Sequence, residues 1–200
     1  MTGEFLASTW LDLQGMGPAA WLAVITGVIY IIAIMRRRRI GWIFSAISAG
    51  ILAVLAARSR LPMQALLQSF YVLAAIYGWR SWSGSAQRKP VTTWHWRGHA
   101  LAVAGCLLLA AGLSLLLAGE SDFPFVDSLV ACMGLTATWM TARVYLENWL
   151  YWFVVDVISL YLFLSQGLAG VALLYVFYLG IAGVGFLAWW KSWRGGLRGL

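Results

Sequence analysis

The chain has 200 residues, of which 62% are hydrophobic and only 10% are charged, and its formal net charge is +7. Soluble domains are about 45–50% apolar and about 25% charged, so this composition excludes an ordinary soluble domain and indicates a membrane protein. The basic residues stand in short clusters between apolar runs. That distribution is typical of topology signals and argues against nucleic-acid binding.

Seven apolar runs predict an all-α integral membrane protein with seven transmembrane helices, because about 20 apolar residues suffice to cross a bilayer. In chain order the runs are 18–35, 40–57, 62–80, 100–118, 124–143, 148–165 and 168–190. Several of the connections are very short, so the spans that they join are expected to be antiparallel neighbours. No cleavable secretory signal is expected, since Glu4 and Asp12 precede the first run and arginines follow it.

The arginine cluster Arg36–Arg39 predicts the orientation. If this cluster is cytoplasmic, 12 of the 14 Lys and Arg residues lie on that side, and only Arg58 and Arg60 lie outside. The positive-inside rule therefore predicts an outer N-terminus and a cytoplasmic C-terminus. The expected location is the inner membrane, with the lipid bilayer as a partner.

An internal repeat relates the two halves of the chain. Residues 134–189 match residues 27–82 at a constant offset of 107 positions, with 14 identities in 56 positions. The informative matches are Gly134/Gly27, Trp149/Trp42, Phe177-Tyr178/Phe70-Tyr71, Gly185/Gly78 and Trp189/Trp82. The repeat predicts a 3+1+3 arrangement, with parallel three-helix repeats over 18–82 and 124–190 and a linker helix over 100–118.

The sixth predicted span carries the strongest sign of a binding site. Asp156 lies near its middle, where a carboxylate costs about 3 kcal/mol on insertion scales. Trp149, Trp152, Asp156 and Ser159 share one helix face, so two aromatic surfaces and an anion predict a site for an aromatic, hydroxylated or cationic solute. For Trp149, close to the inner boundary, an interfacial ring is the alternative interpretation.

The two halves differ in these residues. Trp42 is the equivalent of Trp149 and is a further candidate, but Ser45 and Ala49 occupy the positions of Trp152 and Asp156. The two halves are thus predicted to share one helical scaffold, but only the second half carries the acid and the second tryptophan.

The third and seventh spans supply the other polar candidates. Gln68 and Tyr71 share a helix face with Gln64, and the repeat makes this face equivalent to Tyr175 and Tyr178. A buried amide must be hydrogen-bonded, so Gln68 either contacts solute or joins helices. For Gln64, which is nearer the outer end of the span, a structural role in joining helices or at the rim is favoured.

Other polar residues have a structural interpretation beside a functional one. Asn148 either caps the sixth helix or faces the cavity. Glu147 is interpreted as the interfacial partner of Arg143, four residues before it. Asp127 is a rim carboxylate or a second functional acid.

The remaining residue types predict no catalytic or metal site. Cys106 and Cys132 are expected to be small core residues, and His95 and His99 lack metal-ligand spacing. Tryptophans near span ends are expected in interfacial belts; these are Trp10, Trp21, Trp189, Trp190 and Trp193. No catalytic constellation or cofactor motif is present, so the protein is not expected to be an enzyme.

Two motifs carry a resemblance to a known family. They are ENWLYWFVVDVISLYLF at 147–163, followed by GVGFLAW at 183–189, and the earlier set Gln68, Tyr71, Val72, Tyr77, Gly78, Trp79 and Trp82. This sequence resembles the Pnu family of bacterial vitamin transporters over roughly residues 18–190. It departs from many members at Ser165-Gln166-Gly167, where they have Lys before the Gly, and in its four consecutive arginines.

The resemblance implies a fold related to the SWEET sugar transporters, assembled as a homotrimer. It implies facilitated diffusion of a vitamin precursor that a cytosolic kinase then phosphorylates and retains. Trp149, Trp152, Asp156, Gln68, Tyr71 and Tyr178 would line the substrate site. Nicotinamide riboside is the leading substrate; cationic thiamine, which also suits an aromatic face beside a carboxylate, and riboflavin are the alternatives. Two other functional classes remain as alternatives to a transporter: an enzyme that acts on a membrane-soluble substrate, and a structural or assembly subunit without transport activity.

Overall fold

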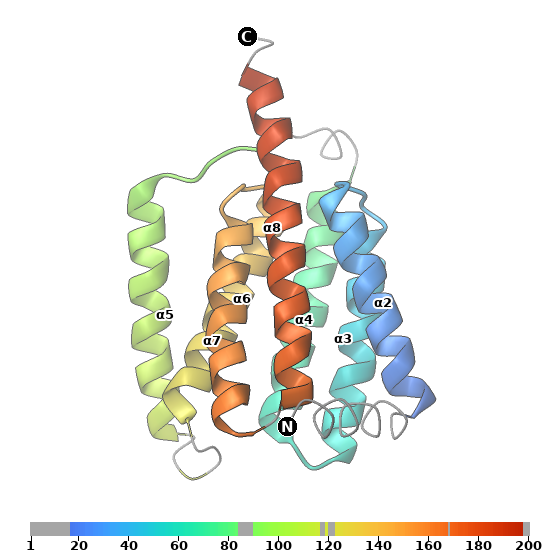
Figure 1. Cartoon of the computed structure of the whole chain (residues 1–200), viewed down its shortest axis with the longest axis vertical. Helices are drawn as coiled ribbons and strands as arrows, with labels where there is room; N and C mark the ends of the chain where they lie inside the picture. The colour runs from blue at the N-terminus through green and yellow to red at the C-terminus, as the bar shows by residue number, and fades with distance from the viewer. Residues whose placement is uncertain (1–16, 84–89, 117–118, 120–122, 168, 198–200) are drawn as a thin grey trace. The chain divides into compact units, whose positions relative to one another are not determined.

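The computed structural model describes residues 17–83, 90–116, 119, 123–167 and 169–197, which form seven α-helices (Figure 1). The helices are α2 (Pro18–Met35), α3 (Gly41–Arg58), α4 (Pro62–Ser81), α5 (Trp96–Leu116), α6 (Pro124–Arg143), α7 (Asn148–Ser165) and α8 (Ala169–Leu197). The expectations for Glu4, Trp10, Asp12, Arg88 and Lys89 fall outside the described residues.

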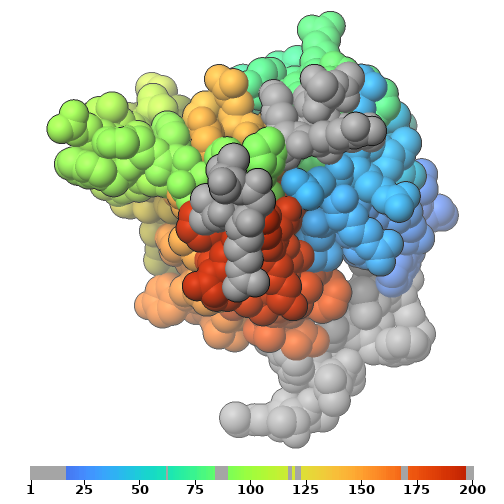
Figure 2. Space-filling view, turned by 90° about the horizontal axis from the view of Figure 1, so that it is seen from above, coloured from blue at the N-terminus to red at the C-terminus, as the bar shows by residue number. Residues whose placement is uncertain are grey.

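The predicted all-α class is confirmed, and the helix bounds follow the predicted runs closely. Three helices begin at a proline, where the missing N–H costs no hydrogen bond. α5 begins four residues before its predicted start, at Trp96, and α8 continues to Leu197. The extra turns of α8 carry Arg194, whose guanidinium lies 4.3 Å from the ring centroid of Trp190; Figure 2 looks onto this end of α8 (red).

Six of the seven helices in the described part of the chain are long and apolar enough to cross a membrane. The exception is α4, which was predicted as a span and forms a helix of 20 residues. Its polar content rather than its length separates it from the other helices, because its sequence contains Gln64, Gln68, Tyr71, Tyr77, Trp79 and Arg80.

The chain forms two compact units. The first contains α2, α3 and α4 together with Thr141–Arg143, and the second contains α5, the rest of α6, α7 and α8. In the first unit α3 packs against both α2 and α4, and in the second α7 packs against α8. The core of the second unit joins α5, α6 and α7 through Cys106, Met133, Ala137, Met140, Tyr151 and Val155.

Each unit contains the same indole-on-glycine contact. The rings of Trp42 and Trp82 meet edge to face at 5.6 Å and 88°, and those of Trp149 and Trp189 do so at 5.7 Å and 88°. A Cβ atom at Gly78 would overlap with the ring of Trp42, and one at Gly185 with that of Trp149. Trp189 is therefore buried, and its predicted place in an interfacial belt is wrong.

The turns of the two units also correspond. Arg37 (φ 52°) follows α2 and Val144 (φ 63°) follows α6; Arg60 (φ 58°) follows α3 and Gly167 (φ 73°) follows α7. Each pair is separated by the 107 positions of the sequence repeat. Left-handed backbone is costly for a side chain with a Cβ, so its recurrence at paired positions reflects a shared turn geometry.

Candidate functional site

The polar stripe predicted on α7 lies on the inward side of that helix. Trp149, Asp156 and Ser159 are buried, and Trp152 is half-buried. Asp156 is 5% exposed although it lies in the middle of an apolar helix. The common face expected for these four residues is therefore present.

Two tyrosines of α8 lie beside the acid. Tyr175 and Tyr178 are both close enough to Asp156 to interact with it electrostatically, and the Tyr175 hydroxyl is hydrogen-bonded with the side chain of Ser159. The tyrosine rings meet edge to face at 5.8 Å, and Phe163 stacks on Tyr175 at 5.3 Å. The structure thus brings the predicted residues of α7 and α8 into one cluster.

The carboxylate of Asp156 has no charged partner among the residues that the structure describes. Within the described residues, no basic side chain forms an ion pair with it and no side chain or backbone N–H is hydrogen-bonded to it. A buried carboxylate without compensation is strongly disfavoured, so a bound cation or a proton would stabilise this cluster.

The two tryptophans of α7 have different surroundings. Trp149 is packed against Gly185 and Trp189, and its indole N–H has no hydrogen-bond partner in the part of the chain that the structure describes. Trp152 packs beside the core of α5, α6 and α7 but keeps part of its ring accessible. Of the two rings, Trp152 has the surface available for stacking.

The first unit has its own aromatic cluster. Trp42 is 1% exposed, and its indole N–H, like that of Trp149, has no partner among the described residues. Tyr30 of α2 lies 5.9 Å from Trp42 and interacts electrostatically with Tyr71. Gln68 and Tyr71 are half-buried on α4. Sequence reasoning missed Tyr30, because its partner in the repeat is Ala137 and no pattern singled it out.

Asn148 is fully buried at the start of α7, and its Nδ2 donates to the Tyr145 carbonyl oxygen at 2.6 Å. Glu147 occupies the N-cap position, and its side chain makes no capping hydrogen bond to this helix. The capping interpretation of Asn148 is therefore wrong: its amide instead ties the turn to the helix.

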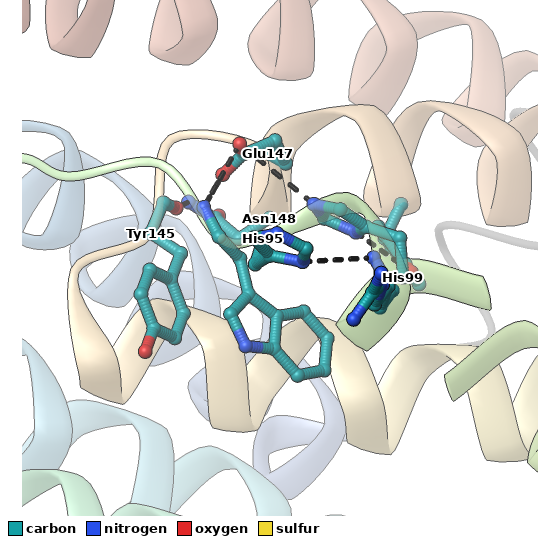
Figure 3. Close-up of polar contacts among 8 residues, drawn as sticks. His95, His99, Tyr145, Glu147 and Asn148 are labelled. Atoms are coloured by element: carbon teal, nitrogen blue, oxygen red, sulfur yellow. Dashed lines mark hydrogen bonds and ion pairs between the residues drawn. The ribbon is translucent and has the colours of Figure 1, made fainter. Parts of the chain in front are cut away.

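Glu147 anchors the segment that leads into α5 (Figure 3). Its two carboxylate oxygens lie 3.1 and 3.2 Å from the backbone nitrogen of Trp94, which donates to them, and Oε1 is 3.7 Å from His99 Nε2. His99 Nδ1 shares a hydrogen bond of 3.1 Å with the Tyr151 hydroxyl. The interpretation of Glu147 as the interfacial partner of Arg143 stays a prediction. The contact with His99 was missed because it joins residues 48 positions apart.

A short backbone pairing reinforces this connection. Thr92 N–H donates to the Val144 carbonyl oxygen at 3.2 Å, and Leu146 N–H donates to the Thr92 carbonyl oxygen at 2.9 Å. The residues before α5 therefore cover the turn between α6 and α7.

These features define a multi-pass membrane protein with a buried acid and aromatic cluster. The family model described as "Nicotinamide mononucleotide transporter" matches residues 17–191. The chain therefore belongs to the nicotinamide mononucleotide transporter family, whose members are transporters and not enzymes.

Known relatives agree with this membership. The chain is 27% identical over 183 residues to the nicotinamide riboside transporter PnuC of Escherichia coli (strain K12), covering 76% of this chain and 77% of the relative. It is 25% identical over 135 residues to the riboflavin/roseoflavin transporter RibM of Streptomyces davaonensis, covering 64% and 63%. The crystal structure of the vitamin B3 transporter PnuC matches the fold with a TM-score of 0.71 at 20% identity, over 96% of this chain and 89% of that one.

Proposed function

We propose that this protein takes up nicotinamide riboside across the bacterial inner membrane by facilitated diffusion, and that cytosolic phosphorylation retains the solute. The observation that carries the proposal is the buried Asp156 carboxylate, which has no cationic partner among the described residues and faces Tyr175 and Tyr178. The similarity to PnuC of Escherichia coli supports the choice of solute.

The chemistry of the cluster suits this solute. The pyridinium ring of nicotinamide riboside is cationic and flat, so Asp156 would offset its charge while the accessible part of Trp152 stacks on it. Tyrosine hydroxyls can donate to and accept from ribose hydroxyls. The proposed binding residues are Trp149, Trp152, Asp156, Gln68, Tyr71, Tyr178, Tyr175, Asn148 and Trp42.

We propose a 3+1+3 architecture with an outer N-terminus, a cytoplasmic C-terminus and a homotrimeric assembly. The paired turns and the paired indole contacts support the duplication of 18–82 and 124–190. The distribution of Lys and Arg supports the orientation.

Riboflavin is a second candidate because RibM is a relative, and thiamine is a third because it is also cationic. Riboflavin is neutral, so its binding should depend little on the charge of Asp156. Thiamine and nicotinamide riboside are both cationic, so the charge of Asp156 does not distinguish between them. Their shapes differ, so the fit to the site would have to do so.

Thermal-shift titration of the purified protein with nicotinamide riboside, thiamine, riboflavin and a sugar tests the assignment, because a ligand stabilises by RT ln(1 + [L]/Kd). Nicotinamide riboside should give the largest shift, and Asp156→Asn should weaken its binding about tenfold or more. Asp127→Asn, which removes a half-buried acid at the start of α6, is the matched control and should bind normally. Equal shifts with wild type and Asp156→Asn would remove Asp156 from the site.

Flux into liposomes tests the transport mode. Facilitated diffusion predicts that internal nicotinamide riboside approaches the external concentration and stops there. Accumulation above that level, driven by a sodium or proton gradient, would contradict it.

A further inference from the structure

The four arginines between α2 and α3 are not equivalent in the structure. Arg39 is held by the protein: its Nε donates to the Trp79 carbonyl oxygen at 2.8 Å, and its guanidinium lies 3.5 Å from the centroid of the Trp79 ring. Arg36 and Arg38 are exposed, and neither side chain has an ion pair or hydrogen bond with the described residues. These two guanidinium groups are available to a ligand.

Arg36 and Arg38 line an open groove of about 210 Å³ together with Ile29, Ile32 and Ala33. The groove is therefore lined by two cationic side chains and by three apolar side chains of α2. Because α2 is long and apolar enough to span a membrane and ends at Met35, the arginines come where the hydrocarbon gives way to the polar region. Figure 2 looks onto this end of α2 and the start of α3 (light blue).

The backbone fixes the turn that carries these arginines. Arg37 N–H donates to the Ile34 carbonyl oxygen and Arg38 N–H to that of Ala33, each at 2.8 Å. This pair of bonds holds Arg37 in the left-handed conformation. A ligand would thus meet a turn that is already ordered, which lowers the entropy cost of binding.

The corresponding turn of the second unit has the same left-handed residue position but different surroundings. There Val144 and Leu146 are hydrogen-bonded to Thr92, and the Glu147 carboxylate beside them accepts from Trp94. The second turn retains a single arginine, Arg143, where the first has four. The cluster of four arginines is therefore particular to the first of the two turns and does not follow from the repeat.

We infer that this groove binds an anionic phospholipid of the surrounding bilayer. Arg36 and Arg38 would hold the headgroup phosphate, and an acyl chain would lie along Ile29 and Ile32. Planar guanidinium groups match phosphate oxygens in geometry, and basic pockets at the ends of membrane helices attract anionic headgroups. A zwitterionic lipid offers the same phosphate beside a cationic ammonium group that offsets its charge, so it binds more weakly.

Thermal shift and native mass spectrometry in detergent, with added phosphatidylglycerol, phosphatidylcholine or soluble glycerol phosphate, test this inference. The wild type should be stabilised by phosphatidylglycerol well above the other two. Arg36→Gln with Arg38→Gln should weaken phosphatidylglycerol binding by roughly twenty-five-fold, because each basic side chain contributes about five-fold near an anionic surface. Arg58→Gln with Arg60→Gln removes the same charge at the far end of α3 and should bind as wild type does.

Three results would overturn the inference. Equal stabilisation of the wild type by phosphatidylcholine would exclude headgroup selectivity, and equal stabilisation by glycerol phosphate would exclude a role for the acyl chain. Unchanged phosphatidylglycerol binding by the Arg36/Arg38 variant would exclude the groove. Ile32→Glu keeps both arginines and should also lose binding, so the groove is tested even if the arginine variant fails to fold.

Discussion

The two units use the same local packing for different chemistry. Each contains a buried tryptophan that lies over a glycine and meets a second tryptophan edge to face, and each has left-handed turns at paired positions. In the first unit small residues stand at the repeat positions of Asp156 and Trp152, namely Ala49 and Ser45. A duplicated scaffold can therefore keep its packing residues fixed while other positions on the same helix acquire an acid and an accessible ring.

The largest expected loss of stability comes from removing the tryptophan packing that the two units share. Trp42→Ala and Trp149→Ala should each destabilise the protein by about 3–5 kcal/mol, because a fully buried indole leaves a cavity beside a glycine. Thermal unfolding in detergent measures both. Similar losses would support equivalent roles, whereas a much smaller loss for Trp149→Ala would break the equivalence.

Trp42→Phe and Trp149→Phe separate packing from binding. Neither indole N–H has a protein partner among the described residues, so each phenylalanine should preserve most of the stability that alanine loses. If the Trp149 indole contacts solute, Trp149→Phe should weaken nicotinamide riboside binding about five-fold in a thermal-shift titration. A normal affinity in that titration would leave Trp149 with a packing role only.

The anchor at Glu147 exists only in the second unit, where Ile40 is its repeat equivalent. Glu147→Ala should cost about 1.5–3 kcal/mol, because the Trp94 N–H loses a charged acceptor. Hydrogen exchange should become faster at residues 92–99. Ile40→Ala, which removes an exposed side chain from the first turn, is the control and should leave that segment protected.

The smallest effect concerns the turn after the second helix of each unit. Arg60 is in the left-handed region where the second unit has Gly167, so Arg60→Gly should stabilise the protein by up to about 1 kcal/mol. Gly167→Ala should destabilise it by a similar amount. A change in the midpoint of thermal unfolding in the opposite direction for either variant would show that the turns are not equivalent.

Several features were predictable because they depend on local chemistry. Runs of apolar residues set the helix bounds, so α3 and α7 appear within one residue of the expected ranges, and prolines mark the starts of α2, α4 and α6. The common face of Trp152, Asp156 and Ser159 follows from helical periodicity alone. The pairing of Trp42 with Trp149 was visible in the repeat.

Other features required contacts between distant residues. The position of Trp189 near a span end predicted an interfacial ring, yet Trp189 is buried. Gly185 has no side chain, so the Trp149 ring packs over it and meets the ring of Trp189. Tyr30 had no counterpart in the repeat, so only its contact with Trp42 revealed it.

The sequence by itself determined the membrane class, the helices, the repeat and the face of α7 that carries Asp156, because hydrophobicity and helical periodicity act over a few residues. The tertiary structure decided which polar groups are satisfied. The Glu147 carboxylate contacts Trp94 and His99, whereas Asp156 has no cationic partner among the described residues. Arg39 is hydrogen-bonded to Trp79, whereas Arg36 and Arg38 are exposed. Those outcomes depend on side chains from different helices meeting in space, and no local pattern encodes them.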